Sequence, residues 1–250
     1  MSLSLKIFAD FDGTITVNDV GDALFERFGG VGCREIIQLY QEGQISAAEC
    51  FRRESAACGI VDVAAMNAFL DHQPIDPTFR EFVRFCAAEQ IALTIFSDGM
   101  DYYIWHILSR EGLGHLPLFS NRLNLLPCSD ALHVRFDPEF PHESDSCDRC
   151  ASCKRAVMVS NTSDDDVVIM IGEGFSDRCP APYADIIFAK DNLLTWCREQ
   201  ELLHYEYRSF GDIARRLHEM LSVHRTQPGK SRLHKRRQAE LARKALFVAE

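Results

Sequence analysis

Residues 3–16 read LSLKIFADFDGTIT, and this stretch decides the fold class of the chain. Residues 3–10 form a short apolar run that stops at Asp10 and Asp12 and is followed by Gly13, a pattern typical of a buried strand that ends in a turn. Three further apolar runs have the same form, and they cover residues 91–96, 167–171 and 186–188. The chain therefore repeats one strand pattern several times.

Helical patterns separate these strands. Residues 78–89 and 102–111 both have helical character, and the first has Asp76 as an expected N-cap with Pro77 at the first helical position. Strands that alternate with helices favour a parallel sheet covered on both faces. The sequence thus predicts an α/β fold with a Rossmann-like, doubly wound parallel sheet.

The alternation is interrupted by a helical insert that follows the first strand. Residues 18–72 contain no convincing strand, and Ser46 with Glu49 matches a capping box. Ligands of such sheets bind at the carboxyl ends of the strands, so an insert at this point is placed to cover the site. We therefore predict a catalytic core of residues 1–17 and 73–222, a helical cap of residues 18–72 and a basic tail of residues 223–250.

Composition limits the classes of function. The 250 residues are 46% hydrophobic and 26% charged, which is ordinary for a globular protein. No apolar run approaches the ~20 residues that span a bilayer, and the N-terminus does not resemble a signal peptide. Ten cysteines without such a signal favour reduced thiols, so we expect a cytoplasmic protein without a membrane partner.

The charge is unevenly distributed. Residues 1–223 carry 35 acidic and 19 basic side chains, whereas residues 224–250 carry 2 acidic and 8 basic ones. An acidic body does not favour nucleic acid as a partner. The basic tail could touch RNA or anionic lipid, but a solvated terminal helix or a frayed end is the favoured interpretation.

The chemistry begins at Asp10 and Asp12. Residues two apart in a strand point to the same side, so both carboxylates face one place and repel each other unless a cation or a proton intervenes. Mg²⁺ prefers oxygen ligands and suits a site that handles phosphate. One carboxylate can then attack phosphorus while the other transfers a proton. An Asp-Gly turn after a strand is the structural alternative.

Polar clusters at the other strand ends favour catalysis. Ser97 and Asp98 follow residues 91–96 and, with backbone N–H groups before a helix, predict a phosphate cradle. Glu173 and Asp177 follow residues 167–171 and add two carboxylates. Lys154, at the start of an expected helix, offers a cation for phosphate. Each residue also has a purely structural alternative as a helix cap or a surface side chain.

This order of motifs resembles the haloacid dehalogenase superfamily. DFDGT at 10–14, Ser97, Lys154 and GEGFSD at 172–177 match its four motifs. The resemblance implies that Asp10 is the nucleophile and Asp12 the general acid and base, while Ser97 and Lys154 bind phosphate. It also implies a Mg²⁺ site formed by Asp10, the Asp12 backbone carbonyl and Glu173, with Asp177 in support. Glu173 stands where this branch usually has Asp.

The helical insert is similar to the cap of the phosphoserine phosphatase-like branch. The stretches DFDGTIT at 10–16, IMIGE at 169–173 and FAKDNLLTWCREQELLHY at 188–205 also resemble, within that branch, the methionine-salvage phosphatases of 2-hydroxy-3-keto-5-methylthiopentenyl-1-phosphate. The similarity covers nearly all of residues 5–220 but not the basic tail. Ser97 with Asp98 is also similar to phosphocholine and phosphoethanolamine phosphatases. The substrate is thus expected to be a small phosphorylated metabolite, with these compounds or phosphoserine as alternatives, and the protein a monomer or homodimer.

Two further features have open interpretations. Asp19 matches the place where phosphoserine phosphatases carry an acidic residue that reads the substrate, and it could equally be the N-cap of the first cap helix. Cys147, Cys150 and Cys153 have zinc-like spacing, with Cys128 and His142 nearby in sequence, but packed reduced thiols are favoured. Other classes considered are a dehalogenase, which Asp12 disfavours, and a weakly catalytic binding protein, for which Glu173 is the one supporting feature.

Overall fold

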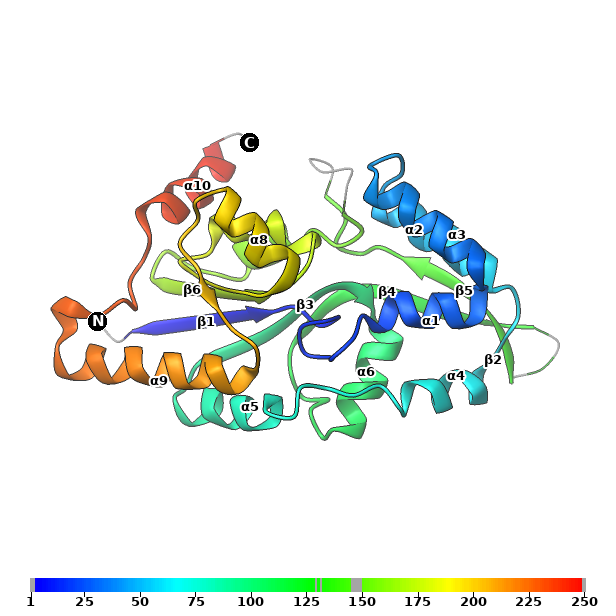
Figure 1. The fold of residues 1–250 in the computed structure, drawn as a ribbon, viewed down its shortest axis with the longest axis horizontal. Helices are drawn as coiled ribbons and strands as arrows, with labels where there is room; N and C mark the ends of the chain where they lie inside the picture. The colour runs from blue at the N-terminus through cyan, green and yellow to red at the C-terminus, as the bar shows by residue number, and fades with distance from the viewer. Residues whose placement is uncertain (1–2, 129, 131, 145–149, 249–250) are drawn as a thin grey trace. The chain divides into compact units, whose positions relative to one another are not determined.

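The computed structural model describes residues 3–128, 130, 132–144 and 150–248. The chain divides into two compact units, whose segments can be followed by colour in Figure 1. Unit 1 contains Met1–Asp10, Ile75–Phe96 and Lys154–Glu250, and unit 2 contains Phe11–Pro74 and Ser97–Cys153. This division groups residues 97–153 with the helical insert. The boundaries given above for the catalytic core and the cap remain a prediction.

Unit 1 is built on parallel strands in the order β3-β1-β6-β7-β8. The strands are β1 (Ser4–Ala9), β6 (Asp166–Gly172), β7 (Ile186–Ala189), β8 (Tyr205–Glu206) and the first part of β3 (Ala92–Met100). Because β1 lies between β3 and β6, its apolar side chains are enclosed, and every residue of β6 is buried. The parallel α/β sheet predicted from the sequence is confirmed.

The helices of unit 1 are α5 (Phe79–Ala88), α7 (Lys154–Ser160), α8 (Asp191–Glu199), α9 (Phe210–Thr226) and α10 (Arg237–Val248), with short 3-10 helices η1 (Ser176–Arg178), η2 (Ala181–Tyr183) and η3 (Pro228–Lys230). Helices α5 and α9 lie side by side (Figure 1), and the ring of Phe210 is 4.6 Å from that of Phe79. The prediction that Asp76 caps α5 and that Pro77 is its first residue is wrong, because the helix begins at Phe79 and its N-cap is Thr78. Asp76 instead accepts a hydrogen bond from the Thr78 N–H.

Unit 2 contains helices α1 (Val20–Gly29), α2 (Val31–Gln41), α3 (Ala47–Cys58), α4 (Val63–Leu70) and α6 (Asp101–Arg110), and strands β2 (Val61–Asp62), β4 (Leu118–Pro127) and β5 (His133–Glu139). Ser46 caps α3 by accepting from the Glu49 N–H, as predicted. The insert is helical except for β2, which pairs antiparallel with β5. None of the helices in the described ranges of the two units could cross a membrane.

The basic tail departs from the expectation of a solvated or frayed end. Leu233 and Ala239 are 2% and 0% exposed, and Arg243 is 9% exposed. Helix α10 packs against η2 in unit 1. The physical reason is that the tail is not uniformly basic. It also contains apolar side chains, and it contains an arginine whose hydrogen-bond acceptors are buried in unit 1. One face of this segment therefore packs against the rest of unit 1.

Candidate active site

In unit 1, a lysine and two carboxylates form a buried cluster. Asp10 follows β1, Lys154 is the first residue of α7, and Asp177 lies in η1. The Lys154 Nζ donates to Asp10 Oδ1 at 2.7 Å and to Asp177 Oδ1 at 2.8 Å. Their exposed fractions are 2% for Lys154, 5% for Asp10 and 0% for Asp177. The fold thus joins three residues predicted from separate motifs.

The charges of this cluster support one another. Burial alone lowers the pKa of Lys154, but the charges of Asp10 and Asp177 and their hydrogen bonds outweigh it and hold that pKa above its ordinary value. Lys154 therefore stays charged. Its Nζ also donates to Ser176 Oγ at 3.0 Å and lies 5.2 Å from the centre of the Phe96 ring. A buried ammonium in this position can neutralise both a carboxylate and a bound anion.

The loop after β6 is organised by Asp177. Its Oδ2 accepts from the backbone N–H groups of Glu173 and Gly174, at 2.9 and 3.0 Å. Gly172 permits this approach, since a Cβ there would lie 2.4 Å from Asp177 Oδ2. Glu173 is partly exposed, and its carbonyl accepts from the Leu193 N–H at 2.7 Å. Asp177 therefore supports the loop, and the side chain of Glu173 keeps solvent access.

In unit 2, Asp12 has a very different environment from that of Asp10. Its Oδ2 accepts from the Tyr103 hydroxyl at 2.7 Å, and its Oδ1 accepts from the N–H groups of Val20 and Gly21 at 3.0 and 3.3 Å. Although Asp12 keeps some exposed area, surrounding protein desolvates its carboxyl group. This burial, together with the charge of Asp19, raises the pKa of Asp12 to about 8, against the opposing effect of these hydrogen bonds.

Ser97 lies inside a strand rather than after it. Strand β3 continues to Met100, so the prediction that it ends at Phe96 is wrong. Ser97 is 1% exposed, and its Oγ accepts from the Gly99 N–H at 2.9 Å and lies 3.5 Å from Asp12 Oδ2. The Gly99 N–H is therefore engaged by Ser97 itself, and the Ser97 hydroxyl is one of the polar groups near Asp12.

Asp98 holds neighbouring segments of unit 2. Its Oδ1 accepts from the Ser152 N–H at 2.6 Å, and its backbone carbonyl accepts from Asn121 Nδ2 at 2.6 Å. Ser152 precedes Lys154 by two residues, so this contact fixes the chain just before that lysine. A role for the Asp98 carboxylate in phosphate binding stays a prediction.

Sequence reasoning missed Tyr103 and Gly99 as parts of this site. Tyr103 is 1% exposed, and its pKa lies well above the ordinary value because of burial and the charges of Asp12 and Asp19. A Cβ on Gly99 would lie 1.9 Å from the Tyr103 hydroxyl and 2.5 Å from Asp12 Oδ2. Only glycine fits here. The contact between Tyr103 and Asp12 joins residues that are far apart in the chain, so no local pattern in the sequence signals it.

Asp19 is the N-cap of α1, since its Oδ1 accepts from the Asp22 N–H at 2.8 Å. The structural interpretation is therefore confirmed, and the substrate-reading role stays a prediction. Of the three cysteines with zinc-like spacing, Cys147 lies outside the described residues. Among the residues that are described, no three His, Cys, Asp or Glu side chains are grouped to hold a metal ion. The Mg²⁺ site remains a prediction, and zinc remains the less favoured alternative to packed, reduced thiols.

Comparisons with known proteins identify a matching family model and several related enzymes. Residues 5–221 match the family model described as Putative Phosphatase. A 2-hydroxy-3-keto-5-methylthiopentenyl-1-phosphate phosphatase of Bacillus mycoides (strain KBAB4) is 28% identical over 224 residues, which cover 88% of this chain and 99% of that protein. One of Bacillus cereus (strain ATCC 10987 / NRS 248) is 27% identical over 228 residues, with the same coverage.

Solved structures extend the likeness to the fold. A phosphoserine phosphatase with an analogue of the phospho-aspartyl intermediate has a TM-score of 0.64 and 16% identity, and the match covers 86% of this chain and 99% of that chain. A substrate-bound phosphoserine phosphatase has a TM-score of 0.63, with the same identity and coverage.

Proposed function

Because this chain belongs to the Putative Phosphatase family, we propose that it hydrolyses a small phosphorylated metabolite through a covalent aspartyl-phosphate on Asp10. It is a phosphatase with the haloacid dehalogenase fold of the phosphoserine phosphatases. The observation that carries the proposal is the buried contact between Lys154 Nζ and Asp10 Oδ1, at 2.7 Å. A carboxylate nucleophile must be ionised, and the adjacent ammonium favours that state.

The proposed first step forms a bond between a carboxylate oxygen of Asp10 and phosphorus and breaks the bond from phosphorus to the leaving oxygen. Asp12 gives its proton to that oxygen. The two residues are separated in the chain only by Phe11. A pKa of about 8 for Asp12 supports this role, because a carboxyl group that keeps its proton near neutral pH can act as an acid.

In the proposed second step, a water oxygen attacks phosphorus and the bond to Asp10 breaks. Asp12, now ionised, takes the water proton, which restores both carboxyl groups. Lys154 and Ser97 are proposed to hold the phosphoryl oxygens, since one offers a buried charge and the other a buried hydroxyl. Tyr103 holds Asp12 in a fixed orientation through its hydroxyl.

Mg²⁺ fits the donor set of this chain. The carboxylates of Asp10 and Glu173 and the backbone carbonyl of Asp12 are all oxygen donors, and Asp177 orders the loop that carries Glu173. Mg²⁺ commonly keeps several waters and takes one or two carboxylates, so it does not require three grouped acidic side chains. When bound, the ion would supply positive charge against the phosphoryl oxygens.

For the substrate we propose 2-hydroxy-3-keto-5-methylthiopentenyl-1-phosphate in methionine salvage, because the relatives above carry that name and align over 99% of their length. Phosphoserine, phosphocholine and phosphoethanolamine remain alternative substrates. The last two are retained because Asp98 matches the residue found at this place in the phosphocholine and phosphoethanolamine phosphatases. We further propose a cytoplasmic monomer or homodimer that binds neither nucleic acid nor membrane. A dehalogenase would not need the proton held by Asp12.

A screen of phosphorylated metabolites and a generic aryl phosphate, with Mg²⁺ and with excess EDTA, tests the proposal. We expect hydrolysis that disappears with EDTA and returns with Mg²⁺ or Mn²⁺. Glu173→Gln should raise the Mg²⁺ concentration for half-maximal rate by about tenfold, as it removes a charge from the ion's surroundings. Glu199→Gln, an exposed carboxylate on α8, is the matched control. Full activity in excess EDTA after dialysis would exclude the metal.

A further inference from the structure

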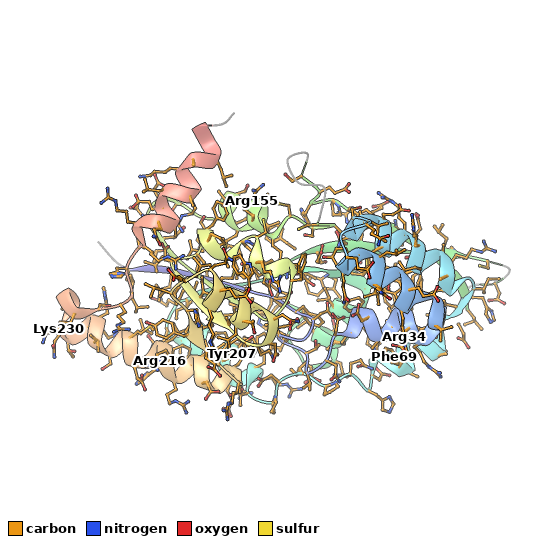
Figure 2. The ribbon with its side chains drawn as sticks, turned by 45° about the horizontal axis from the view of Figure 1, so that its top comes forward. Arg34, Phe69, Arg155, Tyr207, Arg216 and Lys230 are labelled. Carbon is orange, nitrogen blue, oxygen red and sulfur yellow. The ribbon has the colours of Figure 1, made fainter. Side chains whose placement is uncertain are left out.

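The C-terminal segment of the chain lies beyond the family match and is nevertheless part of unit 1. The family model ends at residue 221, within α9. The chain then passes η3, where Figure 2 labels Lys230, and returns to form α10. Leu233 and Ala239 are buried, and α10 packs against η2. The segment therefore contacts the connection between β6 and β7, which is the loop that carries Glu173 and Asp177.

One arginine makes the principal polar contacts of α10 with this loop. Arg243 is 9% exposed, and its guanidinium donates to the Tyr183 carbonyl and to both carboxylate oxygens of Asp185, the latter at 3.2 Å. Asp185 Oδ1 also accepts from the Arg236 N–H at 2.8 Å. A buried, multiply hydrogen-bonded arginine and aspartate pair has a defined geometry, unlike an exposed ion pair.

Asp185 connects this contact to the sheet. Its Oδ2 accepts from the Val168 N–H at 2.9 Å, and its own N–H donates to the Val168 carbonyl at 2.8 Å. Residue 168 lies within β6, the strand that leads directly to Glu173. The far end of the loop is thus fastened both to β6 and to α10.

The near end of the same loop is fastened differently. There, Asp177 accepts from the Glu173 and Gly174 N–H groups and from Lys154 Nζ. Between the two ends the backbone forms only the short helices η1 and η2, which supply few hydrogen bonds of their own. The loop that carries Glu173 and Asp177 is therefore held mainly by the contacts at its two ends.

We infer that Arg243 is a positioning residue, through which the C-terminal segment clamps residues 173–185 and holds Glu173 and Asp177 in place for the phosphatase site. The consequence for metal binding rests on the proposed function. The clamp itself rests only on the contacts within unit 1. A tail that merely adds stability would lower the melting temperature without changing the local opening of this loop.

Hydrogen exchange of the full chain, measured without Mg²⁺ or substrate, separates these two cases. In Arg243→Ala, we expect peptides covering residues 173–185 to exchange at least about tenfold faster, while peptides of α5 and β1 stay unchanged. Lys244→Ala is the matched control, because Lys244 is an exposed neighbour on α10 that pairs with Glu240, and it should leave the loop unchanged. Calorimetric titration should show Mg²⁺ binding at least about threefold weaker in Arg243→Ala only.

A folded Arg243→Ala protein with wild-type exchange in residues 173–185 would overturn the inference. If that variant does not fold, Arg243→Lys decides, because lysine keeps the charge but cannot make the forked contacts. Its loop should exchange at an intermediate rate, and a wild-type rate would again overturn the clamp. If the wild-type chain hydrolyses no phosphate ester, the proposed function is wrong. The exchange experiment still decides whether Arg243 clamps the loop, because it uses neither Mg²⁺ nor substrate.

Discussion

Asp10 and Asp12 are separated by a single residue, yet their surroundings are opposite in character. Asp10 accepts from the buried ammonium of Lys154, which favours the ionised carboxylate. Asp12 meets the hydroxyl of Tyr103, and burial with the nearby charge of Asp19 raises its pKa to about 8. Two identical side chains therefore differ in their surroundings, and this difference supports the proposed roles of Asp10 as nucleophile and Asp12 as acid.

The contrast depends on the two units. Asp10 directly follows β1 in unit 1, whereas Asp12 belongs to unit 2 and is held by residues of α1 and α6. A substitution that alters the surroundings of only one of these two aspartates should therefore affect the proposed role of that aspartate and leave the proposed role of the other unchanged.

Replacing Asp10, the proposed nucleophile, should have the largest effect. Asp10→Asn should lower kcat by more than about 10³-fold on every substrate, because an amide cannot form an acyl phosphate. The measurement is steady-state hydrolysis with saturating Mg²⁺, and circular dichroism shows whether the fold is kept. Near-normal turnover by this variant would remove Asp10 from the centre of the mechanism.

Replacing the acid should depend on the leaving group. Asp12→Asn should lower kcat by about 10²- to 10⁴-fold on an alkyl phosphate, whose leaving oxygen needs a proton. On an aryl phosphate with a weakly basic leaving group, the loss in the first step should be at least about tenfold smaller. The quantity to measure is the rate of the first step on each substrate, taken from the burst of leaving-group release, because the second step is common to both. Equal losses in that first-step rate would mean that Asp12 is not the proton donor.

Disturbing the surroundings of Asp12 should have a smaller effect. In Gly99→Ala, the added Cβ would meet both the Tyr103 hydroxyl and Asp12 Oδ2, so one of them must move. We expect kcat to fall by about 10- to 100-fold, since small misplacements of a reacting group carry such a loss. Gly32→Ala is the control, because a Cβ added at Gly32 would meet no atom within 4 Å. Equal activity of the two variants would contradict the tight packing at Asp12.

The smallest expected effect concerns stability rather than activity. Glu54 on α3 is 2% exposed, and its Oε1 has no hydrogen-bond partner among the described residues. Burial and the charge of Asp22 raise its pKa from 4.5 to about 8, although the Cys50 contact opposes the shift. The folded state thus keeps a proton that the unfolded chain loses near pH 4.5, so this stabilisation is complete below that pH and is lost as pH rises towards 8.

Denaturant titrations at pH 5 and pH 8 measure this effect. The unfolding free energy of the wild-type chain should fall by about 2–4 kcal/mol more than that of Glu54→Gln over this range. Glu35→Gln, an exposed carboxylate on α2, should behave like the wild type. Parallel pH profiles for the wild type and Glu54→Gln would show that this carboxyl group is ionised in the folded protein.

Much of unit 1 could be predicted because its signals are local. The apolar runs that end in Asp10 and before Glu173 predict buried parallel strands, and the structure confirms them as β1 and β6. Lys154 was selected from its motif, and the fold brings it against Asp10 and Asp177. Polar residues that follow such strands lie at the carboxyl edge of the sheet, where ligands of these folds bind.

Unit 2 was harder to predict because its structure depends on contacts between pairs of segments or residues, and a local sequence pattern does not reveal which ones pair. Strands β4 and β5 pair antiparallel and were not foreseen, although the buried Val134 and Phe136 alternate with polar residues in the way that marks a half-buried strand. The partnership of Tyr103 with Asp12 joins residues far apart in the chain, and no local pattern specifies it. The contact between Arg243 and Asp185 was also not predicted. A count of charges shows only that the tail is basic and does not show which of its arginines will be buried against a carboxylate.

The most direct test of the central claim is to trap the phosphorylated enzyme. Wild-type protein is mixed with substrate and Mg²⁺, quenched in acid during turnover and digested, and the peptides are analysed by mass spectrometry. The account predicts a phosphate adduct on Asp10 that borohydride reduces at that residue, and no adduct in Asp10→Asn. An adduct on another residue such as Ser97, or product formed in the first turnover by Asp10→Asn at the wild-type rate, would contradict it.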